Sequence, residues 1–402
     1  MNIITDEKRI DKILERGTIV DILPTKKEFK ERLMSGERLK FFIGLDATAP
    51  TLHLSHAKNL ILLEKFRKLG HEVIVLFGDF TARIGDPSGE KNARKQLTRE
   101  EVSKNVEEWK KLIASLMDFD NKNNPPVIKY NHDWLSKLSF EDIINLASNF
   151  TVQQMLERDM FEKRLEDGKP IHLHEFLYPL MQGYDSVAMD VDIELCGTDQ
   201  IFNALTGRTL LRKLNNKDKF VVAVTLMENP RTGELMSKSK GTGVFLDVSA
   251  NDMYGQIMSQ PDEMMEMLFV NVTELSLSEI GEIINSGNPR DSKMRLAFEI
   301  VKKIKGEEGA KKAEENFKTQ FQKREVPEDI EEFEVKAGEG ILAVLTQIGF
   351  VNSNGEARRK IQEGAVKLND EKVEDPAMTV GAGEYIIKLG RKIAKLKVEG
   401  GK

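Results

Sequence analysis

The chain has 402 residues, of which 40% are hydrophobic and 31% charged, and this balance predicts a folded protein of about two or three domains. It contains no run of 18 apolar residues, and its charged N-terminal segment lacks the apolar core of a secretory signal. We therefore expect a soluble, cytoplasmic protein. The single cysteine, Cys196, excludes an internal disulfide and a cysteine-rich zinc site.

Charge is unevenly distributed along the chain. The formal net charge is −6, yet the residues from Lys336 onward carry 12 basic and 9 acidic side chains. A basic module on an acidic chain is typical of a protein that contacts phosphate groups. A solvated lysine-rich surface gives the same pattern, so charge alone leaves both interpretations open.

The first half of the chain alternates short apolar runs with helical patterns. Strands alternating with helices predict an α/β fold in which a parallel sheet is covered by helices on both faces. The predicted strands are 40–45, 72–77, 127–130, 192–196 and 220–226, and the main predicted helices are 57–69, 98–116 and 199–212.

The sequence pattern changes from alternating strands and helices to helices alone after about Asn251. We expect a Rossmann-like domain over 1–245, an all-helical region over 246–325, an acidic linker over 326–337 and a small α+β module over 338–402. Within the first domain, the stretch 151–166 is amphipathic and rich in methionine and aromatic residues. It is either core or a subunit interface.

The segment from Gly44 to His56 carries the first chemical signal. It reads Gly44-Leu-Asp46-Ala-Thr48-Ala-Pro-Thr-Leu-His53-Leu-Ser55-His56 and lies where a strand gives way to a helix. The free N–H groups of a helix N-terminus suit phosphate groups, and imidazoles at i and i+3 share one helical face. Packing or capping is the simpler role for such a histidine pair, but this setting favours a nucleotide site.

Two further motifs follow. Gly197-Thr198-Asp199-Gln200 comes at the carboxyl end of a strand, where open α/β sheets bind ligands, although Asp199 could be a plain helix cap. Leu235-Met236-Ser237-Lys238-Ser239 offers hydroxyl and ammonium donors to a polyphosphate.

Together these three motifs, in this order, resemble the class I aminoacyl-tRNA synthetases. His53-Leu-Ser-His56 is similar to the first signature of that class, and Leu235–Ser239 to the second. Gly78-Asp-Phe-Thr-Ala-Arg-Ile-Gly-Asp86-Pro-Ser-Gly and Tyr178-Pro-Leu-Met-Gln182-Gly-Tyr-Asp185 resemble the tyrosyl-tRNA synthetases of bacteria. The resemblance extends from about Phe41 to the C-terminus.

The resemblance implies a tyrosine pocket. Asp86, Tyr178 and Gln182 would surround the substrate ammonium, and Asp185 would accept the phenolic O–H. Tyr178, Gln182 and Asp185 lie at i, i+4 and i+7, so one helix could present all three on one stripe. The implied tyrosine-binding set is Phe42, Asp86, Tyr178, Gln182, Asp185 and Gln200.

The resemblance also implies a nucleotide site. The catalytic residues would be Thr48, His53, His56 and Lys238. ATP would be bound by Gly44, Asp46, His53, His56, Gly197, Asp199, Met236, Ser237, Lys238 and Ser239. Magnesium would enter with ATP, and we expect no protein-bound metal.

The C-terminal module resembles the S4-type RNA-binding domain. A serine-capped helix and a following strand carry its candidate RNA contacts, which are Arg358, Arg359, Lys360 and Lys367. By the same resemblance, the helical region would bind the anticodon, a segment near 130–180 would form a homodimer, and the RNA partner would be tRNA(Tyr).

Three positions depart from the family pattern. Leu235 stands where the second signature usually begins with lysine, Ser55 replaces a glycine between the histidines, and Phe42 replaces a tyrosine. Two alternatives therefore stay open. The chain could be a tryptophanyl-tRNA synthetase, or a catalytically impaired RNA-binding paralogue.

Overall fold

The computed structural model describes residues 2–85, 97–236, 242–321, 330–369, 371–390 and 392–399. The chain divides into two compact units, Met1–Glu314 and Glu315–Lys402. None of the helices in these ranges has both the length and the apolar composition needed to cross a lipid bilayer.

The first unit is built on a six-stranded sheet with the strand order β1-β6-β5-β2-β3-β4. The strands are β1 (Ile19–Leu23), β2 (Lys40–Leu45), β3 (Glu72–Phe77), β4 (Val127–Tyr130), β5 (Ile193–Gly197) and β6 (Phe220–Val224). Strands β2 to β6 are parallel, which confirms the predicted α/β fold. The unpredicted strand β1 pairs antiparallel with β6.

Strand order reverses between β2 and β5. These neighbours pair only through Phe41 with Ile193 and Phe42 with Glu194. After Phe42 and Glu194, the two strands are no longer paired with each other up to their carboxyl ends. Open α/β sheets bind their ligands at such a point.

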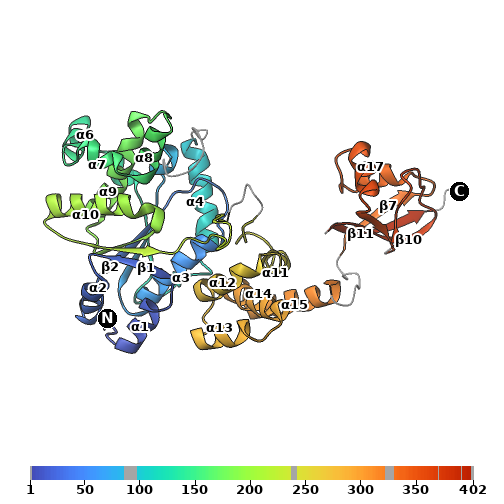
Figure 1. Cartoon of the computed structure of the whole chain (residues 1–402), viewed down its shortest axis with the longest axis horizontal. Helices are drawn as coiled ribbons and strands as arrows, with labels where there is room; N and C mark the ends of the chain where they lie inside the picture. Colours follow the sequence, from blue (N-terminus) through green and yellow to red (C-terminus); the bar gives the residue numbers. More distant parts are fainter. Residues whose placement is uncertain are drawn as a thin grey trace. The chain divides into compact units, whose positions relative to one another are not determined.

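Helices cover both faces of this sheet (Figure 1): α3 (Leu54–Lys68) lies on β2 and β3, whereas α10 (Ile201–Asn215) lies on β5 and β6 and packs against α9 (Leu177–Met189). Helix α4 (Arg99–Ile113) begins with the predicted capping box of Thr98 and Glu101. The other helices of this region are α1 (Glu7–Leu14), α2 (Lys26–Met34), α5 (His132–Leu135), α6 (Phe140–Ala147), α7 (Val152–Leu156) and α8 (Asp159–Glu166).

The region after residue 249 is helical, as predicted. Its helices are α11 (Ala250–Met258), α12 (Met265–Val272), α13 (Leu277–Ile284), α14 (Pro289–Lys305) and α15 (Glu307–Phe321). Arg16, just beyond α1, ties this region to the N-terminal segment. Its guanidinium donates to the carbonyls of Val270, Thr273 and Leu275 at 2.6–2.8 Å, which satisfies carbonyl groups at and beyond the end of α12.

The second unit carries a five-stranded sheet with the order β7-β11-β10-β8-β9, together with two helices. Its elements are β7 (Glu332–Lys336), α16 (Ile341–Gln347), α17 (Asn354–Gln362), β8 (Val366–Leu368), β9 (Glu371–Lys372), β10 (Gly383–Leu389) and β11 (Lys392–Glu399).

The expected linker over 326–337 is wrong at its C-terminal end. Residues Glu332–Lys336 form β7, which pairs in parallel with Lys395–Glu399, and Val335 is buried in the core of this unit. The error arose because β7 is an edge strand of mostly charged residues. Such a strand is stabilised by pairing with a strand far along the chain. The local sequence pattern contains no information about that partner.

Candidate active site

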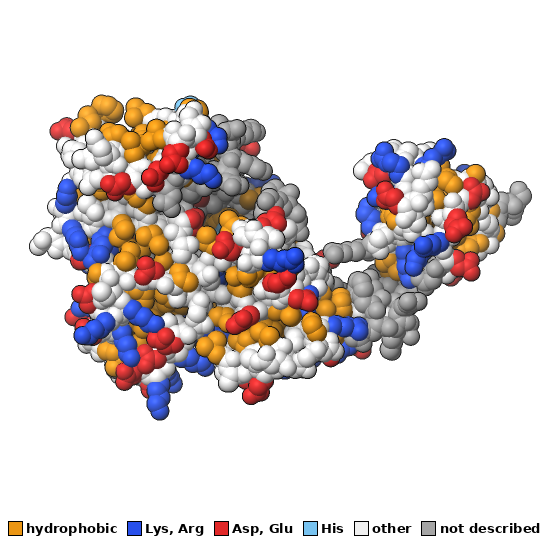
Figure 2. All heavy atoms as spheres, viewed as in Figure 1, with side chains coloured by type: hydrophobic (Ala, Val, Ile, Leu, Met, Phe, Trp, Pro, Cys, Tyr) orange, Lys and Arg blue, Asp and Glu red, His pale blue; other side chains and the backbone are white. Residues whose placement is uncertain are grey.

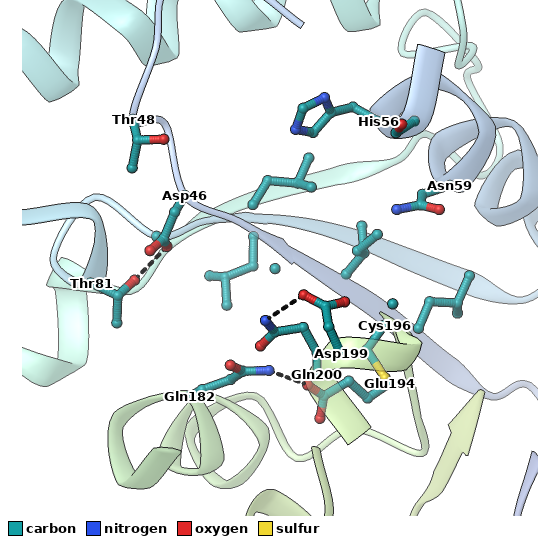
Figure 3. Close-up of a pocket in the computed structure, with 18 of the residues that line it drawn as sticks. Asp46, Thr48, His56, Asn59, Thr81, Gln182, Glu194, Cys196, Asp199 and Gln200 are labelled. Carbon is teal, nitrogen blue, oxygen red and sulfur yellow. Dashed lines mark hydrogen bonds between the residues drawn. The ribbon is translucent and has the colours of Figure 1, made fainter. Parts of the chain in front are cut away.

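A cavity of about 420 Å³ opens at the carboxyl ends of β2 and β5 (Figure 3). Its walls come from β2 and the loop after it, the first turn of α3, one stripe of α9, and the end of β5 with the turn that follows. This is the place where strand order reverses. The fold alone therefore predicts a binding site here.

The cavity brings together most of the residues that the sequence analysis singles out. Those that line it are Phe42, Gly44, Asp46, Thr48, His53, His56, Tyr178, Gln182, Asp185, Gly197, Asp199, Gln200 and Met236. Four predicted residues lie outside the described parts of the chain: Asp86, Ser237, Lys238 and Ser239. The candidate RNA-binding residues belong to the second unit.

Asp185 on α9 marks one end of the cavity. Its Oδ1 accepts a hydrogen bond from Trp134 Nε1 at 2.7 Å, and its Oδ2 accepts one from Asn131 Nδ2 at 3.3 Å. Burial raises the pKa of this carboxyl well above its ordinary value, and the two hydrogen bonds oppose that shift. A buried acceptor held in place by two donors is suited to select a ligand hydroxyl.

A second buried carboxylate lies beside it. Glu194 in β5 accepts a hydrogen bond from Gln182 Nε2 at 3.0 Å and pairs with the ammonium of Lys219, whose side chain is fully buried. Lys219 Nζ also donates to Ser186 Oγ at 2.7 Å. The Gln182 amide oxygen accepts a hydrogen bond from Asn203 Nδ2 at 2.9 Å. Both the nitrogen and the oxygen of the Gln182 amide are therefore held in a fixed orientation.

Asp46, which follows β2, connects the segment after β3 with helix α9. Its Oδ1 accepts from Thr81 Oγ1 at 2.7 Å and its Oδ2 accepts from the Tyr178 hydroxyl at 2.8 Å. This contact places Asp46, expected with ATP, next to a residue expected with tyrosine. A Cβ at Gly78 would lie 1.9 Å from Asp46 Oδ1, so only glycine leaves room for this carboxylate.

The paired histidines occupy the other end. His53 is the N-cap of α3, and its backbone N–H donates to His56 Nδ1 at 3.4 Å, which leaves the proton of His56 on Nε2. The capping role considered from the sequence is therefore real, and the His56 ring still projects into the cavity (Figure 3).

Burial keeps both rings uncharged. It lowers the pKa of His53 to about 4 and that of His56 to about 3, so both are neutral imidazoles near pH 7. Nδ1 of His53 is buried and has no hydrogen-bond partner among the described residues. These groups act as hydrogen-bonding side chains rather than as cations.

Helix α4 holds the loop that precedes α3. Asn105 Nδ2 donates to the Ala47 carbonyl and Trp109 Nε1 to the Ala49 carbonyl, each at 2.8 Å. The Leu54 N–H donates to the Val244 carbonyl at 3.1 Å, so the chain just after residues 237–241 is attached beside His53. Just before those residues, Leu235 and Met236 line the cavity.

Asp199 and Gln200 form the wall opposite α3 (Figure 3). Gln200 Nε2 donates to Asp199 Oδ2 at 3.1 Å. A Cβ at Gly197 would lie 2.4 Å from Asp199 Oδ1, so glycine is needed there as well. Among the described residues, no group of three or more His, Cys, Asp or Glu side chains could hold a metal ion.

The sequence analysis did not identify the residues that hold the predicted site residues in place, nor Lys58, which lines the cavity. The residues that hold the others in place are Asn131, Trp134, Glu194, Asn203 and Lys219. For Glu194 and Lys58 a signal was present. Glu194 stands inside the apolar strand Ile193–Gly197, and Lys58 lies on the buried side of α3. Charged side chains at such positions are seldom buried without a partner.

Comparison with known proteins identifies the class of this fold and site. Residues 34–322 match the family model described as tRNA synthetases class I (W and Y), and residues 322–392 match a tyrosine–tRNA ligase C-terminal domain. A C-terminally truncated mitochondrial tyrosyl-tRNA synthetase from Aspergillus nidulans superposes with a TM-score of 0.67 over 78% of this chain and 94% of its own, at 23% identity.

Similarity to curated sequences is closer. The tyrosine–tRNA ligase of Mannheimia succiniciproducens is 41% identical over 96% of this chain and 97% of its own length. That of Haemophilus influenzae is 40% identical over 98% of each. The chain therefore belongs to the tyrosine–tRNA ligase family of class I synthetases. These relatives favour tyrosine over the tryptophan alternative.

Proposed function

We propose that this cavity joins tyrosine to ATP and then passes the tyrosyl group to tRNA(Tyr). The tyrosine carboxylate attacks the α-phosphorus of ATP, pyrophosphate leaves, and tyrosyl-adenylate remains bound. A hydroxyl of the terminal tRNA adenosine then attacks the tyrosyl carbonyl, and AMP leaves. The observation that carries this proposal is the buried Asp185 carboxylate at one end of a cavity whose other end is a helix N-terminus with two neutral imidazoles.

The tyrosine ring would lie against Phe42 with its hydroxyl donating to Asp185. Since Phe42 has no hydroxyl of its own, Asp185 would recognise the phenol together with the donors that orient it, Trp134 and Asn131. The ammonium would lie near Tyr178 and Gln182, where Asp46 and Glu194 add negative charge. Asp86 belongs to the same proposed set, and Gln200 would face the substrate carboxylate.

The nucleotide would lie along the start of α3. Thr48 and the Nε2–H of His56 would donate to phosphate oxygens, with His53, and the glycines at 44 and 197 would let the nucleotide approach the backbone. Asp199 would accept from the ribose hydroxyls. Met236, Ser237, Lys238 and Ser239 would bind the phosphates, and magnesium bound to ATP would neutralise part of the phosphate charge.

The second unit would bind RNA. Lys367 in β8 is exposed and lies directly opposite Lys372 in β9. Like charges opposite each other weaken a sheet unless an anion lies over them, and a phosphate backbone is such an anion. The other proposed contacts are on α17: Arg358, Arg359 and Lys360. The helical region 246–325 would bind the anticodon.

A homodimer would form through the segment from α6 to the start of α9. Large apolar side chains gather there on the surface (Figure 2), and those most exposed are Phe140, Ile144, Val152, Leu165 and Leu173. Exposed apolar patches of this kind mark protein interfaces. We propose a cytoplasmic location, where tRNA is charged.

Amino-acid-dependent exchange of pyrophosphate into ATP, tested with all twenty amino acids, measures adenylate formation directly. We expect exchange with tyrosine. Exchange with tryptophan alone would overturn the proposed substrate, and tRNA binding without any exchange would indicate the impaired paralogue. A chain ending at residue 321 should keep the exchange and lose tRNA charging. Loss of both would contradict the role given to the second unit.

A further inference from the structure

Lys58 is a buried lysine in the wall of the cavity. It lies one turn into α3, beside the paired histidines, and only 2% of its surface is exposed. Among the described residues that line the cavity, it is the one lysine or arginine. The site has carboxylates at Asp46, Asp185, Glu194 and Asp199, so this side chain is its single described source of positive charge facing a ligand.

Lys58 has little to neutralise it. Its Nζ donates to Asn59 Oδ1 at 2.7 Å, and no carboxylate of the described residues lies within 4 Å of it. Asp199, across the cavity, attracts it from farther away, and its charge opposes protonation of His56. In Figure 3, Asn59 and His56 lie on the α3 wall opposite Asp199.

Burial of the Lys58 ammonium without an anion beside it is costly. Dehydration lowers the pKa of Lys58 to about 7, and the attraction of Asp199 only partly offsets it. By contrast, Lys219 at the amino-acid end is more deeply buried but has Glu194 against it. A buried ammonium is ordinarily paired with an anion, and the described residues place none at contact distance from Lys58.

We propose that Lys58 is a nucleotide-binding residue whose ammonium pairs with a phosphate group of bound ATP. This inference rests on the proposed function, because it takes the ligand of the cavity to be a nucleotide. A phosphate provides the missing counter-charge, and a charge-assisted hydrogen bond in a dehydrated site is stronger than one in water.

Pairing of Lys58 with a phosphate group should change the number of protons bound to the protein. In the free protein, burial lowers the pKa of the Lys58 ammonium to about 7, and a bound phosphate would raise that pKa again. ATP binding at pH 7–8 should therefore take up protons from the solvent. Asp199 favours the charged form in both states, whereas His56, which is already neutral in this range, contributes no uptake of its own.

The test compares Lys58→Met with Lys65→Met. Lys65 is on the same helix, burial likewise lowers its pKa to about 8, and it lies outside the cavity near Glu274. We expect Lys58→Met to raise the KM for ATP and the inhibition constant of AMP roughly ten- to hundredfold in the tyrosine-dependent exchange. The KM for tyrosine and the inhibition constant of adenosine should stay unchanged, and Lys65→Met should behave as the wild type.

Calorimetry of ATP binding in buffers of different ionisation enthalpy supplies the second readout. Proton uptake should be present in the wild type and in Lys65→Met and absent in Lys58→Met. An equal loss of AMP and adenosine binding would overturn the proposal, since it would place Lys58 at the ribose or behind Asp199. So would an unchanged KM for ATP in a folded Lys58→Met protein. If the wild type itself shows no tyrosine-dependent exchange, the proposed function fails instead.

Discussion

The two ends of the cavity are built differently. At the proposed amino-acid end, around Asp185, the polar side chains bond to one another: Trp134 to Asp185, Gln182 to Glu194, and Glu194 to Lys219. At the proposed nucleotide end, around His53 and Lys58, the described residues provide no partner for Nδ1 of His53 and only a neutral amide for Lys58.

This difference separates two tasks. Selection between similar amino acids requires acceptors fixed before the ligand arrives, because a rigid acceptor left unpaired penalises the wrong ligand. Binding a triphosphate requires positive charge on the protein, and the phosphate groups of the ligand then supply the negative charge that neutralises it. The amino-acid end is therefore preorganised, whereas the nucleotide end reaches its full set of partners only when occupied. Four substitutions or conditions test this contrast.

The largest effect should come from Lys219→Met. The change leaves the Glu194 carboxylate buried without its cation, which costs about 3–5 kcal/mol in the free energy of unfolding, measured by urea denaturation. Lys217→Met is the control, because Lys217 pairs with Asp190 and Asp192 near the surface and should cost about 1 kcal/mol or less. Equal losses in the two variants would contradict a preorganised amino-acid end.

Asp185→Ala should remove the acceptor for the tyrosine hydroxyl. We expect kcat/KM for tyrosine to fall by about 10- to 100-fold in the exchange reaction, which corresponds to leaving the buried hydroxyl of the ligand without its acceptor. The value for phenylalanine should not fall with it, so the ratio of the two decreases. An unchanged ratio would mean that another residue reads the hydroxyl.

A lower pH should decrease the free energy of unfolding through His53 and His56. Because the pKa values of His53 and His56 are lowered in the folded protein, the unfolded chain binds more protons below pH 6.5, and stability falls as pH falls. Between pH 6.5 and 5 each imidazole should cost about 2 kcal/mol of unfolding free energy. Denaturation of His56→Asn over this range should give a shallower slope, and a slope equal to that of the wild type would argue against a neutral His56.

The smallest effect should come from Leu235→Lys. This side chain is 49% exposed at the cavity, so a cation there acts through solvent and contributes about 0.2–1 kcal/mol. We expect at most about a fivefold decrease in the KM for ATP. Leu277→Lys, equally exposed on α13, is the control and should change nothing. A larger decrease would mean that the nucleotide end lacks a cation it needs.

Local sequence determined much of this protein. The apolar runs predict β2, β3 and β4 with the bounds that the structure has, and the Thr98–Glu101 pattern predicts the start of α4. The stripe of Tyr178, Gln182 and Asp185 does lie on one helix and lines one cavity. These features succeed because helix and strand periodicity, caps and turns depend on neighbouring residues.

Only the tertiary structure decided which distant groups meet. Asp185 faces Trp134 and Asn131 about fifty residues earlier, and Glu194 meets Lys219 across neighbouring strands. The charged strand β7 joins a sheet through partners some sixty residues later. Periodicity tells which face of an element is buried but not what covers it, so these pairings appear only when the chain is folded.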